Sequence, residues 1–65
     1  MNSSMLMFYL WHEDIPPQQL ADTLELSPDK LYDKIFCGEE FTQEEINRTK
    51  ALLGLTDGEA QSIFG

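Results

Sequence analysis

The stretch Ile15–Gly38 constrains the fold of this 65-residue chain most, because it holds two short helical patterns separated by a break. The first pattern carries its apolar side chains at the spacing of one helix face: Leu20, Ala21 and Leu24. Ala21 is small, which suits a close crossing of two helices. The pattern predicts a short helix that opens at Pro17 and packs through this face.

A second short helix is predicted to begin at Ser27-Pro28. Ser27 can accept a hydrogen bond from a backbone amide of the first turn, and proline suits the first helical position because its missing N–H costs nothing there. Leu31 and Ile35 form the buried face, and Cys37-Gly38 ends the helix. The two helices and their tight turn predict a helix-turn-helix unit over about residues 16–37.

Capping signals predict three more helices. Asn2, Ser3 and Ser4 can cap a helix from Met5 to about Glu13. Later in the chain, Thr42 with Glu45 and Thr56 with Glu59 have the spacing of capping boxes, with Phe41 as a staple residue before the first. The inward positions of these last two helices are Ile46, Thr49, Leu52 and Leu53, followed by Ala60, Ile63 and Phe64. The sequence therefore predicts an all-α, compact five-helix fold in a single domain, residues 1–65.

The charge balance is strongly acidic, with twelve acids against four bases and a net charge of −8. The four basic residues are Lys30, Lys34, Arg48 and Lys50. Such a chain is repelled by phosphate backbones and by anionic membrane surfaces. The apolar run Met5–Trp11 is too short to span a membrane or to act as a secretory signal, so no membrane partner is expected.

The caps and core positions together resemble the lambda-repressor/Cro type of helix-turn-helix protein, especially its short phage and prophage versions. The matching residues are Leu20-Ala21, Ser27, Leu31, Phe41-Thr42, Glu45-Ile46, Leu53-Gly54-Leu55-Thr56 and Ile63-Phe64. The match covers roughly residues 15–64 and is more specific for fold than for activity. The resemblance implies a lambda-repressor-like fold and a transcriptional regulator that binds double-stranded DNA as a dimer, in the cytoplasm of a bacterial host cell.

The resemblance also indicates which residues would contact DNA. These candidates are Gln18, Gln19, Lys30, Tyr32 and Lys34, with both lysines expected to point outward and hold phosphate. Positions that match the family's base-reading residues are Pro28, Asp29, Tyr32 and Asp33. Aspartate only accepts hydrogen bonds, from a cytosine amine, and neighbouring phosphates repel it.

The alternative function is an acidic helix-turn-helix module that does not bind DNA and instead binds a protein, as an inhibitor, an antirepressor or a DNA mimic. The doublets Glu39-Glu40 and Glu44-Glu45 form either a solvated acidic face or an imitation of a phosphate surface. In the first helix, Leu6, Tyr9 and Leu10 suffice to cover the core. The remaining apolar residues either pack inside or lie singly exposed, or they form a partner or dimer surface: Met5, Met7, Phe8 and Trp11. Ile63 and Phe64 either fold back or contact a second subunit.

No catalytic or metal site is expected. His12 and Cys37 are the only histidine and cysteine, without a third residue to orient a nucleophile pair and without enough ligands for zinc. No cofactor is expected either. Cys37 is interpreted as a buried structural cysteine, and a single cysteine excludes an internal disulfide, as is typical of a reducing cytosol.

Overall fold

The computed structural model describes all 65 residues and contains five helices and no strand. They are α1 (Ser3–His12), α2 (Pro17–Thr23), α3 (Pro28–Phe36), α4 (Gln43–Leu53) and α5 (Asp57–Phe64). The radius of gyration is 10.4 Å, against about 10.7 Å for a compact chain of this length. The prediction of a compact all-α fold is confirmed.

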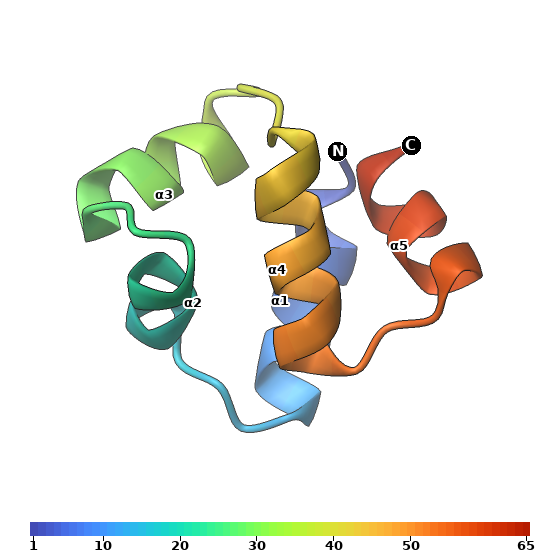
Figure 1. Cartoon of the computed structure of the whole chain (residues 1–65). Helices are drawn as coiled ribbons and strands as arrows, with labels where there is room; N and C mark the ends of the chain where they lie inside the picture. The colour runs from blue at the N-terminus through green and yellow to red at the C-terminus, as the bar shows by residue number, and fades with distance from the viewer.

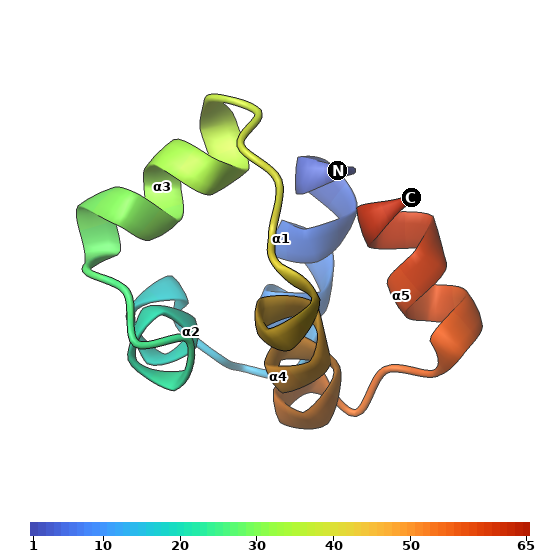
Figure 2. The same cartoon turned by 45° about the horizontal axis from the view of Figure 1, so that its top comes forward.

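Figure 1 shows α1 and α4 in the middle of the view, with α1 behind α4. Helices α2 and α3 lie to one side of them and α5 to the other. Helix α2 packs against both α3 and α4, and α5 packs against α1 and α4. The two chain ends lie close together in both views (Figures 1 and 2), where the backbone N–H of Asn2 donates to the carbonyl of Ile63 at 2.6 Å. None of the five helices is both long enough and apolar enough to cross a membrane.

One hydrophobic core joins all five helices. Its buried members are Leu6, Leu10, Leu20, Ala21, Leu24, Leu31, Ile35, Phe41, Leu53, Leu55 and Ile63. The inward faces predicted for α2 and α3 are confirmed by this set. Thr49 is the one buried polar residue, and its hydroxyl donates to the carbonyl of Glu45 at 2.8 Å, so it is satisfied inside its own helix.

The predicted caps form, with one shift. Asn2 Oδ1 accepts from the backbone N–H of Met5 at 3.1 Å, so α1 begins at Ser3, two residues earlier than predicted. Ser27 caps α3 as expected. Both capping boxes, which begin at Thr42 and Thr56, have the side-chain and backbone bonds in place. The starts of these helices can therefore be predicted from the capping residues in the sequence.

One sequence-based expectation about burial is wrong, and the structure favours one of the two alternatives left open for the end of the last helix. Cys37 is exposed and is not a structural core residue, because it follows the last residue of α3, where the chain turns into solvent. Ile63 is fully buried and Phe64 partly buried against the core. The end of α5 therefore folds back, and Ile63 is not accessible to a second subunit.

The apolar surface expected on α1 is smaller than predicted. Met5 and Met7 are partly buried and pack against the core, because the flanks of α1 also face neighbouring elements. Phe8 and Trp11 are exposed, with their ring centroids 6.3 Å apart. The candidate surface on this helix is therefore reduced to two aromatic residues.

Candidate functional site

The outward face of α3 combines exposed acidic and exposed aromatic side chains. Asp29, Tyr32, Asp33 and Phe36 are all exposed and follow the i, i+3, i+4, i+7 spacing of a single helix face. We call these four residues the α3 stripe. They lie at the free side of α3 because Leu31 and Ile35, on the opposite side, are buried in the core.

The two aromatic residues of the stripe form a stacked pair. Their rings are 6.0 Å apart between centroids and inclined by only 20°. Tyr32 remains 42% exposed and Phe36 64% exposed. Exposed aromatic side chains that cluster and have polar neighbours are typical of interaction surfaces.

The two carboxylates of the stripe have no basic partner within the chain. The five ion pairs of the structure include neither Asp29 nor Asp33. Lys30, which lies on the same helix, is exposed and is also absent from these ion pairs. The α3 stripe therefore presents two uncompensated negative charges beside two apolar rings.

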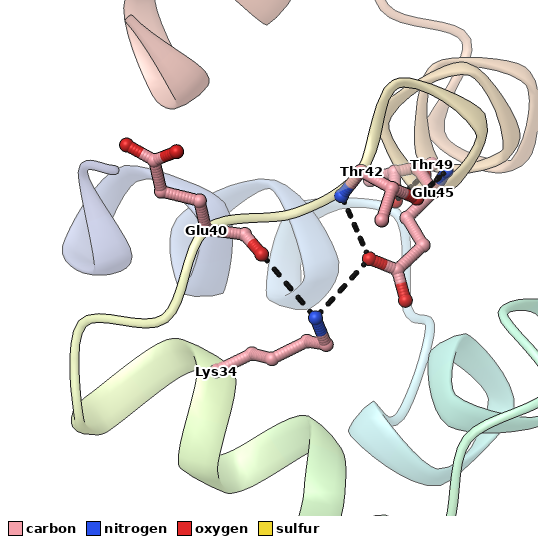
Figure 3. A network of polar contacts seen from close by, with 5 residues as sticks. All are labelled: Lys34, Glu40, Thr42, Glu45 and Thr49. Atoms are coloured by element: carbon pink, nitrogen blue, oxygen red, sulfur yellow. Dashed lines mark hydrogen bonds and ion pairs between the residues drawn. The ribbon is translucent and has the colours of Figure 1, made fainter.

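Lys34 does not point outward, contrary to the prediction. Its Nζ lies 3.3 Å from Glu45 Oε1 and donates to the carbonyl of Glu40 at 3.2 Å (Figure 3). The same Glu45 oxygen accepts from the backbone N–H of Thr42 at 2.8 Å, within the capping box of α4. The side chains of Lys34 and Glu45 are only 17% and 13% exposed. Lys34 thus links α3 to the start of α4 and is not free to hold a phosphate.

Arg48 and Lys50 are also paired within the chain. Arg48 lies 2.7 Å from Glu44 and 3.7 Å from Glu25, and it donates to the carbonyl of Thr23 at 3.2 Å. The contacts with Thr23 and Glu25 tie α4 to the end of α2 and to the turn that follows it. Lys50 is paired with Asp57 at the start of α5. Of the four basic residues, Lys30 alone is without an acidic partner.

The predicted DNA contacts therefore divide into two groups. Gln18, Gln19, Lys30 and Tyr32 are exposed, whereas Lys34 is engaged inside the chain. Phe36 is not among the residues predicted from the sequence, although it belongs to the exposed face. Its spacing of four from Tyr32 and seven from Asp29 indicates that it shares a helix face with them.

A shallow groove lies beside α1, at its connection to α2. It has a volume of about 310 Å³ and is lined by Met7, Leu10, Trp11, Asp14, Ile15, Pro16 and Pro17. The groove is mostly apolar and contains a single acid.

His12 is the last residue of α1, and Cys37 directly follows α3. His12 Nδ1 lies 3.0 Å from Glu13 Oε2 at the exposed end of α1. Nowhere in the chain do three or more histidine, cysteine, aspartate or glutamate side chains come together in a way that would hold a metal ion.

Comparison of the chain with protein-family models, with characterised proteins and with solved structures finds no match. The resemblance to lambda-repressor/Cro-type proteins therefore rests on its residue pattern alone.

Proposed function

We propose that this chain is an acidic helix-turn-helix module of the lambda-repressor/Cro type that binds a protein partner instead of DNA. The observation that carries the proposal is the pairing of its basic residues. Lys34, Arg48 and Lys50 are each neutralised by an acid of the same chain, so Lys30 is the one basic side chain left for an external anion.

Affinity for DNA depends mainly on lysine and arginine side chains that neutralise phosphates and release counterions. One free lysine supplies little of this term in a chain whose net charge is −8. The outward face of α3 adds two unpaired carboxylates where a reading helix would meet base edges and phosphates. Binding of a protein to the same surface does not bring these carboxylates close to phosphates.

A second candidate is the operator-binding regulator that the resemblance implies. It is favoured by the packing of α2 against α3, joined by four residues, with the outer side of α3 open to solvent. Gln18, Gln19, Lys30 and Tyr32 would then contact DNA. Dimerisation in this case would use Phe8 and Trp11, because Ile63 is buried.

The two candidates are separated by retention of DNA on the purified protein. Mixed genomic fragments are passed over immobilised protein at low salt, where attraction to phosphates is strongest, and the bound fraction is measured as salt is raised. We expect no retention above that of a blank surface. Retention of particular fragments, lost in the variant Lys30→Glu and kept in Lys50→Glu, would overturn the proposal in favour of the regulator.

A further inference from the structure

We propose that the α3 stripe binds an arginine-bearing basic segment of a different protein. This inference rests on the proposed function and adds to it the chemistry of the partner. It combines three features: a stacked and exposed aromatic pair, two unpaired carboxylates at helical spacing and the absence of a free arginine in the chain itself.

The aromatic pair suits a planar cation. Tyr32 and Phe36 are stacked, with their ring planes inclined by 20° and their centroids 6.0 Å apart, and both residues are exposed. A guanidinium group is planar and weakly hydrated, and it stacks on aromatic faces more readily than a lysine ammonium does. The rings therefore favour arginine over lysine.

The carboxylates lie on the same face as the rings. Asp29 is three residues before Tyr32, and Asp33 is three residues before Phe36, so each acid is one helical turn from a ring. Arginine presents its N–H groups as a fork that matches a carboxylate in a bidentate arrangement. One guanidinium can thus stack on a ring while it donates to the acid one turn away.

The partner is not a second copy of this chain. The chain contains a single arginine, Arg48, and its guanidinium is held by Glu44, by Glu25 and by the carbonyl of Thr23. The exposed cation Lys30 lies on α3 itself, beside the stripe. With a net charge of −8, two copies would also repel each other. Charge complementarity therefore requires a basic segment from another protein.

The test uses a short arginine-rich peptide as the probe, together with the same peptide in which every arginine is replaced by lysine. Dissociation constants are measured by fluorescence anisotropy at about 0.15 M salt, where long-range attraction is screened beyond about 8 Å. We expect the arginine peptide to bind at least about tenfold more tightly than the lysine peptide, which corresponds to about 1.4 kcal/mol. Equal affinity for the two peptides would overturn the inference.

Paired variants locate the binding surface. We expect Asp29→Asn with Asp33→Asn to weaken binding of the arginine peptide at least about tenfold, a difference of about 1.4 kcal/mol. Glu39→Gln with Glu40→Gln removes the same charge from exposed residues outside the stripe and should change binding by less than about threefold. Equal weakening by both pairs would show that only overall charge matters, and the assignment to α3 would be rejected.

A second pair tests the rings. Tyr32→Ala with Phe36→Ala should abolish the preference for arginine over lysine, whereas Phe8→Ala with Trp11→Ala, the exposed aromatics of α1, should preserve it. All four residues are exposed, and thermal unfolding verifies that each variant is folded. If neither peptide binds the wild-type chain, the inference about arginine is wrong. The proposed function is still supported in that case, provided that the chain does not retain DNA. DNA retention, by contrast, rejects the proposed function itself.

Discussion

Glu25 has a backbone conformation that its side chain disfavours. Its φ of 58° places it in the left-handed region, in the turn between α2 and α3. For a residue with a Cβ atom this conformation costs about 1–2 kcal/mol. The turn is therefore formed against a local penalty, and the packing of α2 and α3 keeps it in place.

Replacing this residue by glycine should relieve the penalty. We expect Glu25→Gly to raise the free energy of unfolding by about 0.5–1 kcal/mol, after allowance for the greater chain entropy of glycine. The ion pair with Arg48 that is lost is 3.7 Å long and largely solvated, so it contributes little. Urea unfolding followed by circular dichroism measures the change.

Glu25→Ala is the matched control, because it loses the same ion pair and keeps the Cβ atom. It should leave stability unchanged or slightly lower. If glycine and alanine have the same effect, strain at this position is not the cause.

At the scale of elements, the ion pair between Lys34 and Glu45 joins α3 to α4 through a contact shielded from water. Glu45 also completes the capping box of α4 by accepting from the backbone N–H of Thr42. One carboxylate thus serves both the end of its own helix and the packing of the neighbouring helix (Figure 3).

We expect Glu45→Gln to lower the free energy of unfolding by about 1–2 kcal/mol, between the values typical of exposed and buried ion pairs. Glutamine can still accept from Thr42, so the loss reports mainly the uncompensated charge of Lys34. Chemical denaturation of the purified variant gives the value.

The neighbouring substitution Glu44→Gln is a close control. Glu44 lies in the same first turn of α4 and is paired with Arg48, but its side chain is 74% exposed. The Glu44→Gln substitution should lower the free energy of unfolding by no more than about 0.5 kcal/mol. Equal losses for the two variants would mean that shielding of the Lys34 pair adds nothing.

At the scale of the whole molecule, Tyr9 and Glu59 join α1 to α5 through contacts fifty residues apart in the sequence. The hydroxyl of Tyr9 donates to Glu59 Oε2 at 3.0 Å, while the other oxygen accepts from the backbone N–H of Thr56 at 2.8 Å. The Thr56 backbone bond, followed by the Tyr9 bond, holds the pKa of Glu59 below its ordinary value of 4.5. The bond to Glu59 also raises the pKa of Tyr9 above 10.0.

These shifts predict a loss of stability in acid. Because the pKa of Glu59 is lower in the folded chain, its contribution is fully present above about pH 4.5 and is lost as the pH falls through the folded value. Thermal unfolding of wild type and Glu59→Gln should differ most near neutral pH, and the difference should shrink below pH 4.5. The exposed Glu39→Gln variant should show no such trend, and a difference for Glu59→Gln that stays constant with pH would contradict this account.

The sequence by itself determined the helices, their caps and most of the core. Ser27, Thr42 and Thr56 cap helices through bonds to residues three positions away, and Leu20, Leu31 and Ile35 are buried because helical spacing puts them on one face. Such features depend on neighbours within one or two helical turns, so they can be predicted from the sequence.

Only the tertiary structure decided which surface groups are free. Lys34 and Lys30 look alike in the sequence, four residues apart on one helix, yet the first is held by Glu45 and Glu40 and the second has no acidic partner. Cys37 is exposed and Met7 is packed against the core for the same reason, since burial depends on what the other helices cover. The charge left for a partner is set by pairings across the fold, which engage three of the four basic residues and neither carboxylate of the α3 stripe.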